Sequence, residues 1–505
     1  MLGKLLTISS VRYGKRLAVC DREVKLSYNE LEMYSCHIAD YLLVKGVARG
    51  SRIGLYINKS ADGIAAIFGI LRVGCTIVPL DVSWSVERCA YIIRDCAISY
   101  LISHSRYAAG VSEITKLAPF LKEAIFLDRS AMDITSSVHT GFPKIGVDEM
   151  AAVLYTSGST ANPKGVMRTQ KAMYVDIIRT TRLYKLKKHE RYALYHPLSF
   201  SPGLDDTLLI LSTGAAICIM PEGISAFAVS IKEFLAKEKV TFCRFGPEVI
   251  ITLATNANLK MKELPDLKKV IIAGSRLPIE YLRSIMKVLP QVKFFYEYGS
   301  TETIAVTVYP IKKTTFQQEE YIPIGRPQRG VGTYIVGEDG RKLKEKPGVT
   351  GELYVYSHSL MSGYWNDPVM TKEVLCQDPF CRRKRLVYRT KDMVTVDSSK
   401  NYVFLGRKDN VLKTKGYRIG LEEIEAALER HPKIKEAGCL ATQDKDKGDC
   451  IKALVVVKEG EKLVEEEVRI FCREHLAGYM TPETIEFRQS LPRLSSGKID
   501  KKSLK

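Results

Sequence analysis

Short apolar runs rich in β-branched and aromatic residues alternate with helical patterns through roughly the first 400 residues. Residues 52–80 show the pattern: "RIGLYI" is typical of a buried strand, "IAAIFGILRVG" of a helix and "CTIVPL" of a second strand. The later runs "VTFCRF", "KVIIAG" and "KFFYEYG" repeat the strand signal, and glycine or proline closes most of the runs. This alternation predicts an α/β fold with largely parallel strands.

The character of the chain changes after "NYVFLGRKDN" (401–410). An amphipathic helical pattern, "LEEIEAALERHP", ends at Pro432 and is followed by the strand-like "IKALVVVK" and a second helical pattern, "VEEEVRIFCREHL". These elements suit a small α+β domain, and a chain of 505 residues is too long for one compact core. We therefore predict a large N-terminal domain at 1–405, a hinge at 406–410 and a small C-terminal domain at 411–505.

The composition narrows the functional class. No window approaches eighteen consecutive apolar residues, and the first residues lack the apolar run of a signal peptide, so we predict a cytoplasmic protein without a membrane partner. The twelve cysteines are scattered without CxxC pairs, which argues against a zinc site or a disulfide framework. The formal net charge of +19 favours anionic partners, but the chain lacks the basic stripe interleaved with aromatic residues that indicates nucleic-acid binding.

A loop at 155–166, "YTSGSTANPKGV", follows the apolar pair Val153 and Leu154. A strand followed by such a loop can turn backbone N–H groups and hydroxyls toward one anion, and a lysine adds a positive charge. The loop does not match the GxxxxGK[ST] motif of P-loop NTPases, because Pro163 precedes Lys164 and Gly165 follows it. The residues of the loop alone leave two alternatives open: a phosphate cradle or an ordinary flexible loop.

Further motifs place this loop in a known context. The chain contains, in order, "LRVGCTIVPLDVSWSVER" (71–88), "YEYGSTET" (296–303), "GELYVYSHSLMSGYWNDP" (351–368), "YRTKDMV" (388–394), "FLGRKDNVLKTKGYRIGLEEIEAAL" (404–428) and "LPRLSSGKIDKKSL" (491–504). Together with the loop they resemble the adenylate-forming superfamily, which includes acyl-CoA synthetases, luciferases and the adenylation domains of nonribosomal peptide synthetases. The resemblance implies a large adenylate-forming domain with mixed, largely parallel sheets, followed by a small, mobile α+β lid domain.

The resemblance also implies two half-reactions. A carboxylate attacks the α-phosphate of ATP to give an acyl-adenylate and pyrophosphate, and a thiol then displaces AMP. Because the first step brings two anions together, it needs cations and oriented donors rather than covalent catalysis. The cofactors implied are ATP and Mg²⁺, and Glu302 would hold the metal, a hard cation that prefers carboxylate and phosphate oxygens.

The residues carried over from the family motifs fall into three groups. Lys498, Glu302 and Thr301 would be catalytic, with Lys498 reaching from the small domain to the carboxylate and the ATP oxygens. The ATP-binding residues would be Thr156, Ser157, Gly158, Ser159, Thr160, Lys164, Tyr298, Gly299, Ser300, Asp392, Arg407 and Arg418. Tyr298 would stack on adenine and Asp392 would bind both ribose hydroxyls. Asp409 would be the hinge residue, at the point where the composition changes.

Two residues depart from the family pattern near these motifs. Ala161 stands where the signature loop usually has glycine, and Lys391 replaces the usual glycine before Asp392. Neither change removes a functional side chain. We expect that they alter the loop geometry or add charge near the nucleotide.

The substrate pocket is the part that departs most from the relatives. The sequences of the C-terminal motifs most resemble those of stand-alone amino-acid-activating enzymes. In those enzymes an aspartate follows the phenylalanine of an "SFD" segment and pairs with the α-ammonium of the substrate. The matching positions here are Phe200, Ser201, Pro202, Asp205, Arg244, Ile271, Ala273, Glu297, Ala305 and Val306. Ser201 takes the place of the aspartate, and a serine cannot neutralise an ammonium group. An ordinary α-amino acid is therefore in doubt.

Three charged residues in the pocket allow two explanations. Burying Asp205, Arg244 and Glu297 without partners would be expensive. They either pair with one another and shape the pocket, or Asp205 and Glu297 bind a displaced or side-chain amino group. We favour a polar, amine-bearing carboxylic acid as the substrate, with an aryl or other non-amino acid as the alternative.

The thiol acceptor and the rival functions complete the expectations. We expect the phosphopantetheine arm of a separate acyl or peptidyl carrier protein, an acidic partner that the positive charge would steer. The alternative is an acyl-CoA or aryl-CoA ligase that uses free coenzyme A. A catalytically silent homologue is disfavoured because Lys498, Glu302 and Asp392 are all present. The best prediction is thus an AMP-forming acid–thiol ligase without a nucleic-acid partner.

Overall fold

The computed structural model describes residues 1–22, 24–127, 141–156, 162–224, 227–256, 259–261, 263–275, 277–312, 322–408, 411–414, 417–444, 448–492 and 504. At 411–414, 417, 418, 422, 443 and 448 it describes the backbone alone. Parallel and antiparallel sheets are combined with helices on their faces, so the predicted α/β class is confirmed. None of the helices in these ranges is long and apolar enough to cross a membrane.

The largest sheet has nine strands. In spatial order they are β15 (Arg326–Pro327), β14 (Ile304–Pro310), β13 (Lys293–Ser300), β12 (Lys269–Ala273), β11 (Phe242–Phe245), β9 (Arg191–Leu194), β10 (Ala216–Ile219), β1 (Leu17–Asp21) and β2 (Val24–Ser27). The pairings from β13 through β1 are parallel, and those at both edges are antiparallel. The predicted parallel strands thus form the centre of the sheet.

A second sheet has seven strands. They run in the order β18 (Gly363–Tyr364), β8 (Lys164–Thr169), β7 (Met150–Thr156), β4 (Thr76–Leu80), β3 (Arg52–Tyr56), β5 (Tyr100–His104) and β6 (Glu123–Leu127). The pairings from β7 through β6 are parallel, whereas β7 and β8 form an antiparallel pair on either side of the signature loop. The two strands that flank the loop therefore lie side by side in one sheet.

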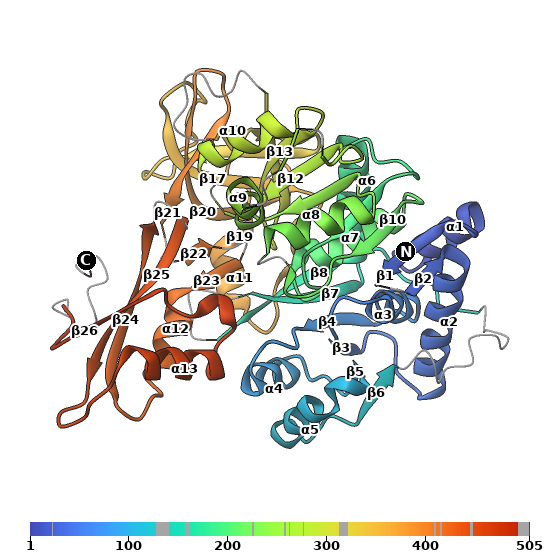
Figure 1. The fold of residues 1–505 in the computed structure, drawn as a ribbon, viewed down its shortest axis with the longest axis horizontal. Helices are drawn as coiled ribbons and strands as arrows, with labels where there is room; N and C mark the ends of the chain where they lie inside the picture. The colour runs from blue at the N-terminus through green and yellow to red at the C-terminus, as the bar shows by residue number, and fades with distance from the viewer. Residues whose placement is uncertain are drawn as a thin grey trace.

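Helices pack on both faces of the sheets (Figure 1). In chain order they are α1 (Lys4–Tyr13), α2 (Tyr28–Val44), α3 (Ala61–Arg72), α4 (Val86–Asp95), α5 (Ala108–Leu117), α6 (Gln170–Leu183), α7 (Ser201–Leu211), α8 (Ala228–Lys237), α9 (Pro247–Asn256), α10 (Ile279–Val288), α11 (Pro368–Val374), α12 (Leu421–Leu428) and α13 (Glu465–His475). α3 is apolar on nearly every side and belongs to a core cluster that includes residues of both large sheets. A helix that is apolar all round is stable only when it is buried in this way.

The two faces of the strands β11 to β13 belong to different cores. Cys243, Val270 and Ile272 pack with α8, α9 and α10. Phe242 and Ile271, which alternate with them, pack with α6 and α7. Successive side chains of a strand point to opposite faces, so this period of two fixes which residues can face α7. Arg244 and Glu297 share the α7 face.

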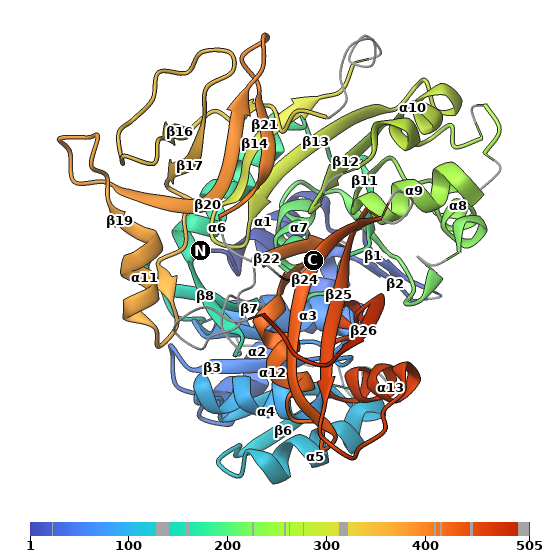
Figure 2. The ribbon, with the colours of Figure 1, turned by 90° about the vertical axis from the view of Figure 1, so that its left-hand side faces the viewer.

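The remaining described strands form smaller, mostly antiparallel sheets (Figure 2). β16 (Val331–Val336), β17 (Thr350–Ser357), β20 (Leu386–Val396) and β19 (Leu375–Gln377) make one sheet, and β21 (Tyr402–Arg407) pairs with β20. β22 (Val411–Thr414) pairs with β23 (Tyr417–Gly420), and β24 (Ile434–Asp444), β25 (Gly448–Val457) and β26 (Thr484–Arg488) form the last sheet. The helices and strand predicted after residue 410 are confirmed as α12, β25 and α13, although α12 ends before Pro432.

A buried ion pair joins the C-terminal part to the N-terminal part. Arg88 on α4 donates to Glu423 on α12, and the two side chains are 9% and 8% exposed. The Arg88 guanidinium also lies 4.7 Å from the ring centre of Trp84, which packs in the same apolar cluster as residues of α12. The small part is therefore anchored to α4 by a charge pair shielded from water.

We expect Arg88→Ala to lower the free energy of local unfolding of α12 by about 3–5 kcal/mol, because it leaves the Glu423 carboxylate buried without its cation. Hydrogen exchange of α12 amides at neutral pH would measure the change. Lys116→Ala serves as the matched control, because Lys116 and Glu113 form a largely exposed pair, which contributes little. Equal protection of α12 in the two variants would contradict the prediction.

Candidate functional site

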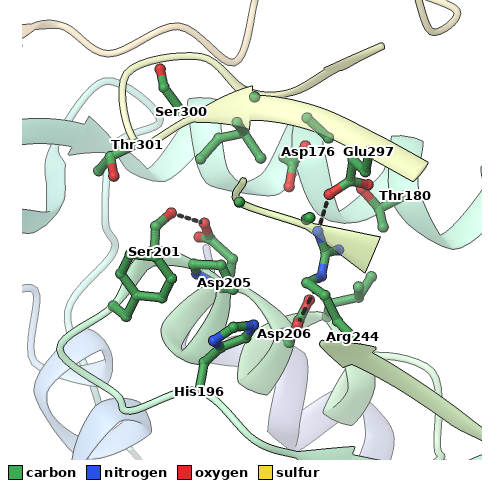
Figure 3. A pocket seen from close by; sticks show the side chains of 18 residues that line it. Asp176, Thr180, His196, Ser201, Asp205, Asp206, Arg244, Glu297, Ser300 and Thr301 are labelled. Atoms are coloured by element: carbon green, nitrogen blue, oxygen red, sulfur yellow. Dashed lines mark hydrogen bonds and ion pairs between the residues drawn. The ribbon is translucent and has the colours of Figure 1, made fainter. Parts of the chain in front are cut away.

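A cavity opens between α7 and the carboxyl ends of β11, β12 and β13 (Figure 3). Arg244 is next to last in β11, Ala273 ends β12, and Glu297 faces Ala273 across the β12–β13 pairing. Ligand sites of open parallel sheets lie at the carboxyl ends of their strands. The fold thus places the charged residues of the predicted pocket where a ligand can reach them.

Arg244 is the centre of a buried network in this cavity. Its guanidinium donates to Glu297 and lies 3.1 Å, Nε to Oδ2, from Asp206. Glu297 also accepts a hydrogen bond of 2.7 Å from the Tyr184 hydroxyl, and Asp206 accepts one from Tyr192. Burial raises the pKa of Asp206 to about 6. Glu297 and Asp206 therefore share one cation, and each also accepts a hydrogen bond from a tyrosine hydroxyl.

Asp205 has weaker partners. Its Oδ2 accepts a hydrogen bond of 2.7 Å from the hydroxyl of Ser201, one helical turn earlier on α7. The nearest cation is Arg168, whose Nη1 lies 3.5 Å away. The side chain of Asp205 is 12% exposed, whereas that of Arg168 is fully buried and its Nε and Nη2 atoms have no hydrogen-bond partner in the described part of the chain. Desolvation raises the pKa of Asp205.

Two further residues add to the polar wall of the cavity. Asp176 on α6 forms an ion pair of 2.6 Å with Arg179, which also donates to the carbonyl oxygen of Ala305. His196 is buried beside the rings of Tyr195 and Phe200. Desolvation, with a smaller contribution from Arg244 and Lys59, lowers the pKa of His196 to about 3. The imidazole is therefore neutral at physiological pH.

This low pKa of His196 predicts a pH-dependent stability. Below pH 6.5 the unfolded chain binds a proton on this residue that the folded protein does not bind until about pH 3, so the free energy of unfolding falls as the pH drops through this window. His196→Gln removes this effect. The free energy of unfolding of the variant, relative to that of the parent protein, should therefore rise by about 2 kcal/mol when the pH falls from 7.5 to 5. Urea unfolding of both proteins at the two pH values measures this. Asp206, whose pKa is raised, contributes a pH dependence of the opposite sign. That contribution is the same in both proteins and cancels in the comparison. An unchanged difference between the proteins would contradict the prediction.

The turn between β13 and β14 carries the predicted motif "YGSTET". A Cβ on Gly299 would lie 2.0 Å from the carbonyl oxygen of Ile304, so only glycine fits there. Ile304 has a φ of 57°, an uncommon backbone conformation for a β-branched residue. Gly299, Ser300, Thr301 and Ile304 line the cavity, and strained backbone of this kind clusters at functional sites.

A second cavity adjoins the first and shares Gly274, Glu297 and Gly299 with it. Tyr298 lines it, together with residues that the sequence did not single out. These are Ser275, Leu277, Tyr296, Ile322, Ile324, Phe404 and Asp449, the last from β25 of the C-terminal part. A cavity with an aromatic and aliphatic wall and few polar groups suits a flat heterocycle.

Asp392 lies beside the second cavity in a buried network. It accepts hydrogen bonds from the Tyr298 hydroxyl and from Arg407, its partner in the β20–β21 pairing. Asp392 is 1% exposed, and its ion pair with Arg407 neutralises its charge. The predicted ribose-binding aspartate thus stands next to the predicted adenine-stacking tyrosine, and their roles in binding ATP stay predictions.

Glu302 is fully buried in the turn between β13 and β14. Its Oε1 accepts a hydrogen bond of 2.8 Å from the Tyr364 hydroxyl, and its carbonyl oxygen accepts from the backbone of Met361. Lys164, at the start of β8, lies 5.8 Å from the ring centre of Tyr364. The signature-loop lysine and the carboxylate predicted to hold Mg²⁺ therefore converge on one tyrosine. One carboxylate is enough for Mg²⁺, which takes other ligands from phosphates and water.

Several predicted residues lie outside the described part of the chain. These are Ser157, Gly158, Ser159, Thr160, Ala161, Asp409 and Lys498, and for Arg418 only the backbone in β23 is described. Thr156 ends β7 at the edge of this gap. The predicted phosphate cradle, hinge residue and catalytic lysine accordingly stay predictions.

The structure places eight of the ten predicted pocket residues on the cavity wall: Phe200, Ser201, Pro202, Asp205, Arg244, Ala273, Glu297 and Ala305. Ile271 and Val306 are fully buried in the core and are not among the residues that line it, and the substrate contacts expected of all ten residues stay predictions. Val306 follows Ala305 in β14 and so points to the opposite face. Ile271 lies two residues before the end of β12, beneath the cavity.

Lys391 is the second departure from the family pattern. It has a φ of 61°, so a conformation that favours glycine is occupied by lysine. Its ammonium pairs with Glu373 at 2.6 Å, and its backbone N–H donates to Glu352. The ammonium of Lys391 therefore has a half-exposed carboxylate as its partner, and its backbone holds a conformation that glycine adopts more easily.

Sequence reasoning missed the residues that balance the pocket charges. Asp206, Arg168, Arg179, Asp176 and His196 come from α7, β8, α6 and the segment before α7. Asp206 follows Asp205 directly, so a second carboxylate at the pocket was visible in the sequence. No comparable signal pointed to Arg168, because a single arginine in a strand does not reveal which helix it faces.

Two family models match the chain. The model described as AMP-binding enzyme matches residues 7–365, and the model described as AMP-binding enzyme C-terminal domain matches residues 423–498. Among curated proteins, a linear gramicidin synthase polypeptide of Brevibacillus parabrevis is 30% identical over 495 residues, which are 98% of this chain and 9% of that protein. The L-proline–[L-prolyl-carrier protein] ligase of Streptomyces coelicolor is 29% identical over 95% of this chain and 91% of its own length.

The chain spans only 6% to 19% of the length of the gramicidin, plipastatin and surfactin synthase polypeptides that it matches. Among solved structures, the amide bond synthetase McbA of Marinactinospora thermotolerans is similar with a TM-score of 0.87 and 23% identity, over 99% of this chain and 98% of that one. An artificially fused adenylation–PCP protein of Klebsiella oxytoca, NpsA-ThdA, gives a TM-score of 0.84 with 21% identity, over 96% and 93%. These likenesses support the fold.

Proposed function

Because this chain belongs to the AMP-binding enzyme family, we propose that it activates a carboxylic acid with ATP and passes the acyl group to a thiol. A carboxylate oxygen of the acid attacks the α-phosphorus, pyrophosphate leaves with the electrons of the broken P–O bond, and acyl-AMP forms. A thiol then attacks the acyl carbon and AMP leaves. The observation that carries this proposal is the pair of adjoining cavities, one aromatic and one charged, that meet at Gly299.

The residues of the chain would divide the work of the first step. The second cavity would hold adenine, and Asp392, positioned by Arg407, would accept from the ribose hydroxyls. Thr301 lines the first cavity next to Gly299 and would meet the α-phosphate between the two cavities. Glu302 would hold Mg²⁺, which offsets phosphate charge when it is bound. These roles place and neutralise two anions, which is the main requirement of this chemistry.

The charges of the first cavity favour an acid that carries an amino group. Four carboxylates lie on its wall: Asp176, Asp205, Asp206 and Glu297. Three guanidinium groups pair with them, those of Arg168, Arg179 and Arg244, and His196 is neutral. Among the described residues one negative charge is left over, and a substrate ammonium would balance it. An aryl acid would leave it unbalanced.

We favour a separate carrier protein as the acceptor. The Streptomyces relative is named as a carrier-protein ligase and is matched over 91% of its length. The net charge of +19 would steer an acidic carrier protein to the enzyme. Free coenzyme A is the second candidate, because it is also anionic and ends in the same phosphopantetheine thiol.

The test is ATP–pyrophosphate exchange over a panel of amino acids, aryl acids and short fatty acids, followed by transfer. Exchange with an amine-bearing acid is expected. Acyl transfer to a holo carrier protein but not to free coenzyme A would support the carrier, and the reverse would select the coenzyme A ligase. A protein that binds ATP but exchanges with no acid in the panel would contradict the proposed function.

A further inference from the structure

We propose that Asp205 is the amine-binding residue of the cavity, and that the substrate is an acid whose amino group lies beyond the α-carbon, as in β- and γ-amino acids. This inference rests on the proposed function, since it takes the acid to react beside Thr301. It replaces the broader expectation that Asp205 and Glu297 serve together. It also assigns Arg244 and Glu297 to the framework of the cavity.

The pairing of the four carboxylates singles out Asp205. Glu297 and Asp206 are both held by Arg244, and Asp176 forms an ion pair of 2.6 Å with Arg179. Asp205 has a hydroxyl at 2.7 Å and a guanidinium nitrogen at 3.5 Å, which is too long for a good hydrogen bond. It is therefore the carboxylate with the most to gain from an ammonium group.

Exposure points the same way. The side chains of Glu297 and Asp206 are 4% and 2% exposed, and Asp205 is 12% exposed while lining the cavity. An ammonium group that bound Glu297 would have to compete with Arg244 and Tyr184. An ammonium at Asp205 would add a charge-assisted hydrogen bond without breaking an existing ion pair.

The position of Asp205 along α7 sets the length of the substrate. Ser201 begins α7, and Asp205 follows one turn later. In Figure 3 Ser201 lies on the side of Asp205 that faces Thr301, and Arg244 and Asp206 lie on the opposite side. An α-ammonium would stand one carbon from the reacting carboxyl and so beside the neutral Ser201. Asp205 would instead meet an amino group one or two carbons farther along the chain.

Substrate pairs that differ only in the amine test this proposal. β-Alanine is compared with butanoate, and 4-aminobutanoate with pentanoate, in ATP–pyrophosphate exchange with the 505-residue chain. In at least one pair, the parent enzyme should exchange faster with the amino acid than with the acid that lacks the amine. It should also exchange faster with that amino acid than with α-alanine. Asp205→Asn should lower that preference about 10- to 150-fold, the range expected for one hydrogen bond to a charged group. The ratio within a pair does not depend on how much of a variant is folded.

Asp176→Asn is the matched control. It makes the same chemical change on the wall of the same cavity, but at a carboxylate that already has Arg179 as its partner. The amine preference should survive in this variant. Loss of the preference in both variants would overturn the assignment to Asp205, because the effect would then belong to the overall charge of the cavity.

A swap of the two residues gives an independent readout. Ser201→Asp with Asp205→Ser keeps the composition of α7 and moves the carboxylate one turn toward Thr301. The preference should shift toward α-alanine. Two results would overturn the inference while the proposed function stands. One is that the parent enzyme exchanges with α-amino acids. The other is that it exchanges with acids that lack an amine, at a rate that Asp205→Asn does not change. Exchange with no acid at all would contradict the proposed function.

Discussion

Arg244→Met is expected to lower the free energy of unfolding by about 3–5 kcal/mol, more than any other single replacement in the cavity. Arg244 is paired with both Glu297 and Asp206, and all three side chains are less than one tenth exposed. Methionine fills a similar volume but leaves two buried carboxylates without a cation. Denaturant unfolding at pH 7.5 would measure the change.

Two companion variants show whether the loss comes from the network. Arg244→Met combined with Glu297→Gln removes a stranded charge and should recover part of the stability, because replacing both members of a buried pair costs less than replacing one. Arg341→Met is the control, since the Arg341 side chain is 86% exposed and lies 3.6 Å from Asp339. A single Arg244→Met variant as stable as Arg341→Met would contradict the prediction.

Lys498→Ala is expected to reduce adenylate formation about 100- to 1000-fold, the size of effect seen when one preorganised electrostatic donor is removed. Lys498 lies outside the described residues, and its role rests on the motif "SSGKID". A point charge on a flexible stem can bridge the carboxylate and the ATP oxygens as they approach. Transfer from a supplied acyl-adenylate does not require that bridge and should stay largely intact.

Measuring the two half-reactions separately tests this role. ATP–pyrophosphate exchange follows adenylate formation, and thioester formation from synthetic acyl-adenylate follows transfer. Lys501→Ala, three residues along the same segment, should leave both rates unchanged. Equal loss of both half-reactions in Lys498→Ala would show that the lysine supports the fold or the thiol step instead.

Much of the fold was predictable because it depends on local patterns. The apolar runs at 52–57, 75–80 and 269–274 correspond to β3, β4 and β12, and the run between the first two corresponds to α3. Burial on both faces of a parallel strand demands such continuous apolar runs. The family was predictable for a different reason, because its ordered motifs extend along the whole chain and the family models match it.

The sequence indicated many of the residues near the cavity, but not which of them line it and which lie beneath it. Matching positions to a known pattern named Arg244, Ala273 and Glu297, and the structure places all three on the cavity wall. The same matching named Ile271 and Val306, which are buried in the core and do not line the cavity. Whether a strand residue faces a cavity or lies beneath it depends on how far the strand continues and on what packs over it, and neither is written in the residue itself.

The sequence by itself determined the α/β architecture, the family and the positions that carry charge into the cavity. Only the tertiary structure decided which of those charges are already neutralised. Arg244 and Glu297 are 53 residues apart in the chain, and Arg168 and Asp205 are 37 residues apart. Ion pairing depends on which side chains meet across separate strands and helices, and a few tenths of an ångström decide its strength. The structure therefore left Asp205 as the carboxylate best placed for a substrate amine.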